Sequence, residues 1–344
     1  MRASTLTRRT FLGLGSAMAT PSDMVPVSGV LAYIDRAGLL TTIHAPSGRA
    51  AVHLGVTPSS LLVWLDDHTL LVQTTAATDA ILASYDIRTR IISSMLTLPP
   101  GFDAVSAAAG RAKSFAVVAA GRARHAPSRL FRSDDGHIRE VPVGQLFILE
   151  AAFRGPQLSL IAQRRDTFEQ LARWDEIGGT FVRTIAVGAI TGRYLSSGFA
   201  ADGTSALSRF DDDPPHISTE IRDREGTLTN TFVGWGAPAW SSRRDELALT
   251  DRTPHLRCGT RVAVADRQKG IRAEWSLGSS VDARVIGWSG EAVLLKRAPC
   301  DLSEIGSVPR ERVDVLALHA RSGALAVVAT DAHGPLWQPA DLAD

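Results

Sequence analysis

Four side chains that could do acid–base chemistry stand at or just before the starts of short apolar runs: Asp103, Arg193, Asp282 and His333. Carboxylates together with a histidine and an arginine could serve as acid, base and charge stabiliser in a hydrolase or lyase. Converging carboxylates can instead hold a calcium ion, which takes about six to eight oxygens, so two carboxylates are too few for a complete cage. The structural alternative is that these side chains cap strand ends and hydrogen-bond loop amides. The fold decides whether they converge.

A larger set of polar side chains falls in segments predicted as loops. Those favoured as ligand contacts are Arg164, Arg165, His216, Arg252, His255 and Arg297. They would suit an anionic or sugar-like ligand or the loop of a protein partner, and the alternative is an ordinary solvated rim. The run of Asp211, Asp212 and Asp213 before two prolines is a candidate cation site, although such a charge run is also typical of an exposed loop.

Motifs of several enzyme classes are missing. There is no Gly-x-Ser-x-Gly elbow, because the segment from Gly287 to Gly290 is one residue too short. The zinc motif His-Glu-x-x-His and the phosphate-binding Gly-x-x-x-x-Gly-Lys do not occur, and the sequence has no dinucleotide-binding motif in a suitable setting. We therefore expect no cofactor, and calcium is the one ion that the carboxylates would favour.

The charge and hydropathy of the chain limit the classes of partner that we expect. The chain has 37 basic and 36 acidic residues and a net charge of +1, so long-range attraction to nucleic acid or to an anionic membrane is not expected. No apolar run approaches the roughly 18 to 20 residues that a membrane-spanning helix needs. The expected partner is a protein or a small polar ligand, and the expected state is a monomer without a transmembrane segment.

The elements that must position these side chains repeat about every 45 residues, the spacing of a propeller blade of four short strands. Each unit opens with an apolar run that ends in an aromatic residue and is followed by a polar turn and a second β-type run. The aromatic residues are Trp64, Phe153, Phe199, Trp240, Trp288 and Trp337. One further unit, around Ala104–Gly110, has the same run and turn without the aromatic residue.

Seven hairpin turns follow the predicted third strands, and their Gly, Asp and Ser residues suit a tight backbone. The C-terminal segment Gly334–Pro339 has the signature of an inner strand with no blade after it. Gly29–Asp35 starts the chain as a second strand with no inner strand before it, so we expect the two ends to complete one blade. The predicted fold is all-β: one seven-bladed β-propeller over residues 24–344, its first blade closed by the strand around Trp337.

The alternatives are a pair of β-sandwiches or a helical domain joined to a small sheet, and neither requires the repeat or the complementary ends. Only Phe168–Asp175 could form a short helix, and a strand over 170–174 is preferred there.

The segment from Pro238 to Leu249, Pro-Ala-Trp-Ser-Ser-Arg-Arg-Asp-Glu-Leu-Ala-Leu, resembles the Pro-x-Trp-Ser-x-Asp-Gly-x-x-Ile-Ala repeat of TolB-like, WD40-like propellers. The Asp-Gly of that repeat survives at Asp202 and Gly203 but is replaced in this segment and in the next unit. The resemblance covers the chain from about Ser28 onward. It implies the fold rather than an activity, since such repeats occur in scaffolds, receptors and enzymes alike.

The two cysteines, Cys258 and Cys300, are too few for a structural zinc site. Under the blade assignment both fall in loops between second and third strands, on the same face of neighbouring blades. An oxidising compartment would join them, so we predict a disulfide, with two unrelated free thiols as the alternative.

Residues 1–23 differ from the rest of the chain. Arg8 and Arg9 precede Phe11 and Leu12 and a small apolar stretch, which resembles the twin-arginine export signal. The sequence Ala17-Met18-Ala19 offers small residues for a signal-peptidase cut, and the alternative is a disordered basic leader. We therefore expect a periplasmic or secreted protein.

These observations lead to two main functional hypotheses, and a purely structural envelope protein is a third possibility. The first is an exported, non-catalytic binding propeller whose loop-rich face contacts a ligand or a protein partner. The alternative is a propeller-type enzyme, a lactonase-like hydrolase or a lyase acting on a sugar or lactone, with Asp103, Asp282, Arg193 and His333 at the mouth of the central channel.

Overall fold

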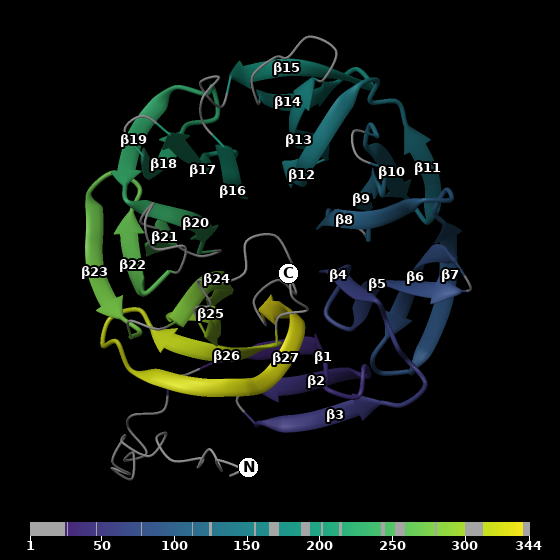
Figure 1. Ribbon diagram of the computed structural model, residues 1–344, viewed down its shortest axis with the longest axis horizontal. Coiled ribbons are helices and arrows are strands. Elements are labelled where there is room, and N and C mark those ends of the chain that lie inside the picture. Colours follow the sequence, from purple (N-terminus) through teal and green to yellow (C-terminus); the bar gives the residue numbers. More distant parts are fainter. Residues whose placement is uncertain are drawn as a thin grey trace, which may run out of the picture.

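Short β-type runs separated by Gly- and Asp-containing turns form strands along the chain. The computed structural model of the protein describes residues 25, 27–45, 47–76, 78–111, 113–123, 126–154, 156–164, 172–186, 193–200, 202–212, 215–241, 245–251, 259–278, 281–299 and 312–339. These residues form 27 strands, arranged as sheets around a central axis (Figure 1). The described residues contain no helix that is long and apolar enough to cross a membrane.

Each sheet unit is an antiparallel blade of four strands in chain order. The innermost strands line the centre of the ring in Figure 1 and are β4 (Ser60–Trp64), β8 (Phe102–Ala109), β12 (Leu146–Arg154), β16 (Arg193–Phe199), β20 (Trp235–Trp240) and β24 (Val281–Ser289). The second strands are β1 (Gly29–Ile34), β5 (Thr69–Ala76), β9 (Phe115–Gly121), β13 (Gln157–Arg164), β17 (Ser205–Asp212), β21 (Glu246–Asp251) and β25 (Ala292–Pro299).

The predicted hairpin turns join the third strands to the outer strands. The third strands are β2 (Leu40–Ala45), β6 (Asp79–Asp86), β10 (Arg129–Asp134), β14 (Ala172–Ile177), β18 (Pro215–Arg222), β22 (Arg261–Asp266) and β26 (Arg312–His319). The outer strands are β3 (Arg49–His53), β7 (Ile91–Thr97), β11 (His137–Val141), β15 (Thr180–Ala186), β19 (Leu228–Val233) and β23 (Gly270–Ser276). Strand β14 confirms the preference for a strand over a helix from Ala172 onward.

The last strand, β27 (Leu325–Pro339), belongs to two blades and closes the ring. Its first part pairs with β26, with Leu325 opposite Leu318, and its last part pairs with β1, with Trp337 opposite Leu31. In Figure 1 this strand sweeps along the outer edge and then turns towards the centre beside β1. Blades seven and one therefore form one continuous sheet of seven strands, and five further sheets have four strands each. The predicted seven-bladed ring and its closure by the chain ends are confirmed.

Every inner strand carries an irregularity that sequence patterning did not predict. In β4, for example, Leu61 lies opposite Val72 and Val63 opposite Leu71, so Leu62 is one residue in excess of the second strand. Register shifts of the same kind occur in β8, β12, β16, β20, β24 and in the part of β27 that pairs with β1. A bulge increases the local twist and redirects side chains, so each inner strand bends near the channel. The closing strand shares this feature and is a genuine inner strand.

The hydrophobic core lies between neighbouring blades rather than within one sheet. Trp64 and Leu70 of blade two pack with Leu40 of blade one, and Phe115 of blade three packs with Leu82 of blade two. The repeated aromatic residues serve this packing. Two of them also bond across the interface: the indole N–H of Trp240 donates to the Gly198 carbonyl (3.1 Å), and that of Trp288 donates to the Ala239 carbonyl (2.9 Å).

A glycine on β1 permits the closing contact. Gly29 has φ +149°, and a Cβ on it would lie 2.3 Å from the carbonyl oxygen of Gln338 and 2.6 Å from the Trp337 ring. The close approach of Trp337 and Gln338 at this position therefore requires a residue without a side chain.

We predict that Gly29→Ala lowers the free energy of unfolding by about 3–5 kcal/mol, because the new methyl group adds both backbone strain and a clash with the closing strand. The matched control is Gly48→Ala, where φ is +65° but no atom lies within 4 Å of the added Cβ. That variant should lose only about 1–2 kcal/mol, from the left-handed backbone alone. Urea unfolding of the three proteins measures the difference, and equal losses in both variants would contradict the closure geometry.

Candidate functional site

Antiparallel pairing divides the ring into two faces. The loop-rich face holds the connections between second and third strands, together with the links that lead into each inner strand. The opposite face, which we term the turn face, holds the hairpin turns. Inner strands begin at the loop-rich face, so Asp103, Arg193, Asp282 and His333 are all at strand positions on that face. They come from blades three, five, seven and one.

Asp103 is held by side chains of its own blade and of blade two. The Arg122 guanidinium donates two hydrogen bonds to its carboxylate, from Nε at 2.7 Å and from Nη2 at 2.9 Å. Gln73 donates from Nε2 to Oδ1 at 3.4 Å and accepts the amide of Ala104 at 2.7 Å. The Arg122 contact lowers the pKa of Asp103. This carboxylate is therefore ionised near neutral pH and is a poor proton donor.

Asp282 has a comparable position between blades six and seven. Its Oδ1 accepts the amide of Gly259 at 2.8 Å, and its Oδ2 lies 3.4 Å from Nη2 of Arg284. The amide of Ala283 donates in turn to the Gly259 carbonyl at 2.8 Å. The side chain is 16% exposed. The contacts of both acids join neighbouring blades, which is the strand-capping role that the sequence left as the alternative.

The other two candidates differ in how far the structure describes them. Arg193 begins β16 opposite Phe210, and only its backbone is described. His333 lies at the crossover of β27, opposite Arg312 of blade seven and Ile34 of blade one. It lines a depression of about 180 Å³ that is also bordered by Ile34, Asp35, Gly38, Pro58, Ser59 and Arg312. This depression spans blades seven, one and two on the loop-rich face.

The predicted ligand contacts fall partly on described residues. Arg164 ends β13 and is exposed, and His216 lies in β18 opposite Asp211. Arg297 forms an ion pair with Asp314, with Nη2 and Oδ2 2.9 Å apart. Arg165, Arg252 and His255 lie outside the described residues, as do both cysteines, Cys258 and Cys300.

The acidic run sits at a strand end rather than wholly in a loop. The backbone of Asp211 and Asp212 continues β17, with Asp212 opposite Pro215 at the start of β18. Asp213 lies outside the described residues. The strand extends further than the charge run indicated, because pairing with β18 determines where it ends.

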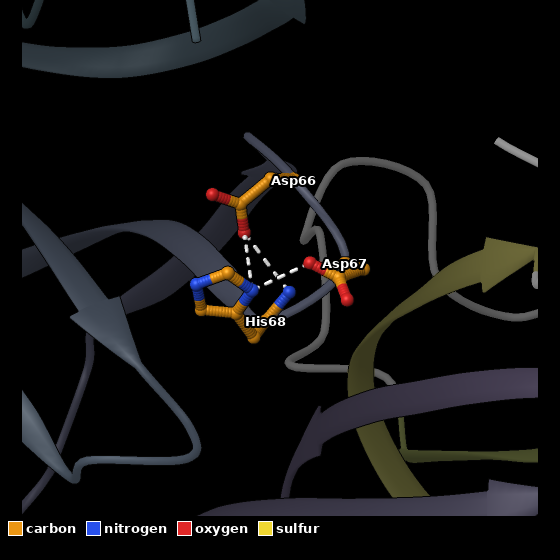
Figure 2. A group of neighbouring side chains, drawn as sticks. All are labelled: Asp66, Asp67 and His68. Carbon is orange, nitrogen blue, oxygen red and sulfur yellow. Dashed lines mark hydrogen bonds and ion pairs between the residues drawn. The ribbon is translucent and has the colours of Figure 1, made fainter. Parts of the chain in front are cut away.

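A different cluster, on the turn face, has the composition of a metal site. One potential ligand atom each from Asp66, Asp67 and His68 lies within 4.8 Å of the others, and Figure 2 shows the three side chains converging in the turn after β4. His68 Nδ1 is 2.5 Å from Asp67 Oδ1 and 3.3 Å from Asp66 Oδ1. Sequence analysis recognised this segment only as a turn.

The chain's own groups already occupy this cluster. Asp66 Oδ1 accepts the amides of His68 (2.9 Å) and Thr69 (2.6 Å), while Oδ2 lies 2.8 Å from Lys113 Nζ of blade three. Burial alone would raise the pKa of Asp66, but these hydrogen bonds outweigh it and lower the pKa to about 2. Asp67 pairs with Arg88 at 2.5 Å. The cluster is a turn cap and an inter-blade ion pair, and nothing in it points to a bound metal.

Comparisons with known proteins define the fold. No protein-family model matches the sequence, and no curated protein matches it. Similar solved structures include a protein from Lactobacillus plantarum (TM-score 0.58, 12% identity, 90% of this chain and 99% of that chain). Others are an oligogalacturonate lyase in complex with manganese (0.55, 10%, 94% and 93%) and TolB from Acinetobacter baumannii (0.50, 14%, 92% and 68%). This chain is a β-propeller by fold. At sequence identities this low, the activities of these proteins cannot be transferred to this chain.

The turn-cap interpretation predicts unequal effects of two neighbouring substitutions. Asp66→Ala should lower the free energy of unfolding by about 1–3 kcal/mol, because it leaves two turn amides and Lys113 without their acceptor. Asp67→Ala should lower the free energy of unfolding by less than about 1 kcal/mol, because Asp67 forms its ion pairs at the exposed surface. Thermal unfolding with and without Ca²⁺ or Mn²⁺ checks this. A metal-dependent rise in melting temperature that both substitutions abolish would instead identify a metal site.

Proposed function

We propose that this propeller is an exported, non-catalytic binding protein, which acts as a monomer and holds a protein partner or a small polar ligand on its loop-rich face. The observation that carries the proposal is the state of the acids at the inner-strand starts. Asp103 is engaged by Arg122 and Gln73, and Asp282 by the Gly259 amide. These groups hold the blades in place and leave the loops above them as the variable surface.

Catalysis fits these contacts less well. A general acid must carry a proton near neutral pH, and the Arg122 contact lowers the pKa of Asp103. The enzyme alternative, a lyase or lactonase-like hydrolase using Asp103, Asp282, Arg193 and His333, draws on the shared fold with an oligogalacturonate lyase, and fold alone is weak support.

The depression beside His333 is the favoured contact point for a ligand. It combines His333 and the Arg312 guanidinium with the Asp35 carboxylate, which already accepts the amides of Ala37 and Leu39. We therefore expect the histidine and the guanidinium to provide the main polar contacts to a small polar ligand. At about 180 Å³ it is smaller than most pockets for drug-sized ligands, which suits one polar side chain or a single small group. Arg297 of blade seven and, across the ring, Arg164 of blade four and His216 of blade five would extend the contact to a larger partner on the same face.

Export and the disulfide belong to the same proposal. Gly259, the neighbour of Cys258, bonds to Asp282 and Ala283 at the start of β24. Pro299, the neighbour of Cys300, lies opposite Val281 at the start of the same strand. Both flanking residues thus contact one short segment, which supports a Cys258–Cys300 bridge between blades six and seven in an oxidising compartment.

A ligand panel separates binding from catalysis. We expect no turnover of oligogalacturonate with Mn²⁺ or of a sugar lactone, and we expect a bound ligand or partner to raise the melting temperature, since ligand at a hundred times its Kd adds about 2.7 kcal/mol. His333→Ala should abolish the rise, whereas His137→Ala, on the turn face, should preserve it. Turnover that disappears in Asp103→Asn would establish the enzyme alternative.

Mass spectrometry of the exported protein tests localisation and bridging together. In a bacterium with twin-arginine transport, the envelope fraction should contain a chain cleaved after Ala19, with its mass lowered by two hydrogens. Replacing Arg8 and Arg9 with lysine should retain the full-length, thiol-containing chain in the cytoplasm. An uncleaved envelope protein with two reactive thiols would contradict both parts.

A further inference from the structure

A groove between blades two and three opens on the turn face and the outer rim, far from the proposed ligand depression. Its volume is about 480 Å³, within the range of ligand-binding pockets. Blade two contributes side chains from β5, β6 and β7, and blade three contributes side chains from β9 and β10 and from their turns. The lining is Leu65, Thr69, Ser84, Asp86, Thr89, Ile91, Ser93, Met95, Lys113, Phe115, Ser133, Asp135 and Gly136.

One wall of this groove is an uncharged sheet edge. Strand β7 is the last strand of its sheet, so one side of its backbone has no partner strand. Its sequence, Ile-Ile-Ser-Ser-Met-Leu-Thr, has no charged residue, and Ile91 and Ile92 are 60% and 45% exposed. The outer strands β3, β11, β15 and β23 all carry at least one charged residue, whereas β19, Leu-Thr-Asn-Thr-Phe-Val, has none either. Proteins usually protect such edges with charges or with bulges. Strand β7 has no charge, and its register shift, with Ser94 opposite Ala83 and Leu96 opposite Leu82, leaves Ile91–Ser94 as the regular part of the edge.

The groove and the edge form one continuous surface. Ile91, Ser93 and Met95 alternate along β7 and all line the groove, so they share one face of the strand. A strand added to β7 would place every second side chain on that same face. Those side chains would enter the groove above Phe115 and Leu65, which form its apolar floor. The geometry is that of β-strand addition, where backbone bonds give affinity and a groove selects side chains.

Two polar features indicate which side chains would fit. The hydroxyl of Ser133 is buried, its residue is 1% exposed, and it has no hydrogen-bond partner among the described residues. An unsatisfied buried hydroxyl is unfavourable and gains from a ligand that bonds to it. At the mouth, Asp135 supplies negative charge, and Asp86 adds to it although its Oδ1 already accepts the amides of Arg88 and Thr89. The one lysine of the lining, Lys113, is neutralised by Asp66 at 2.8 Å. The groove is therefore complementary to a basic side chain next to an apolar one.

We propose that β7 and the groove beside it bind an extended peptide segment of a partner protein, which adds to blade two as a fifth strand. The peptide presents an apolar side chain to Phe115 and Leu65 and, two residues along, a lysine or arginine to Asp86 and Asp135. This second binding surface is independent of the ligand site proposed on the loop-rich face.

The test starts from a displayed library of random nine-residue peptides selected on the folded, purified propeller. We expect enriched peptides with an apolar residue two positions from a lysine or arginine. Fluorescence anisotropy of a synthetic copy should show binding that is lost when alternate backbone amides of the peptide are N-methylated, because only one edge of an added strand bonds to β7.

Matched variants place the peptide on the surface. Ser93→Lys should weaken binding at least about tenfold by putting a cation into the groove, whereas Ser94→Lys, on the next residue and the opposite face of β7, should change it less than about twofold. Asp135→Asn keeps a residue that tolerates the turn's φ of +52° and should weaken only peptides that carry the basic residue.

Three results would overturn the proposal. One is a library that yields no enriched peptide, and another is a selected peptide that binds Ser93→Lys as tightly as the unmodified protein. The third is self-association in sedimentation experiments that Ser93→Lys abolishes, because a second copy of this chain would then be the occupant of the edge.

Discussion

The pairing of the last strand with the first is the constraint on which the rest of the structure depends. Strand β27 joins residues about 300 positions apart in sequence, Leu31 and Trp337, without a covalent bond. Each blade packs only on its two neighbours. If the pairing between the last and first strands were lost, the ring would have two free ends that could fray. The cost of ordering so long a chain segment is offset by the core on both sides of the closing blade, where Leu31 is fully buried.

Polar side chains also join neighbouring blades at both faces of the ring. On the loop-rich face, Asp103 and Asp282 connect neighbouring blades. On the turn face, Asp66 forms an ion pair with Lys113 of the next blade. Arg267 of blade six likewise bonds to Asp202 of blade five at 2.6 Å. Residues that could have been catalytic or metal-binding by type are thus used to set the spacing of the blades. We propose that function lies instead on surfaces that the scaffold does not need: the depression at His333 and the open edge of β7.

The repeat, the turns and the closure could be predicted from the sequence because each depends on local chemistry. An aromatic residue at the end of an apolar run and a glycine in a hairpin turn carry the same meaning in every blade, so seven weak signals reinforce one another. The bulges could not be predicted, since Leu62 looks like any other apolar residue of its strand. They arise from inter-strand register, which depends on the partner strand.

The partners of the candidate site residues were beyond sequence reasoning for a related reason. Gln73 is 30 positions before Asp103, and Lys113 is 47 positions after Asp66, so neither pair falls within a motif. The two residues of each pair lie on neighbouring blades and meet only because the folded blades pack side by side. The sequence therefore placed Asp103 on the correct face but did not predict that Arg122 and Gln73 would already hold its carboxylate.

Native-state hydrogen exchange tests the closure most directly. The amides of β1 and of Leu336, Trp337 and Gln338 that bond across the closing pair should exchange as slowly as the amides of the other blades. Their exchange should require global unfolding. Exchange of the 336–338 amides well before the rest of the propeller, with the other blades still protected, would contradict it, because the ring would then be stable with its closing strand released.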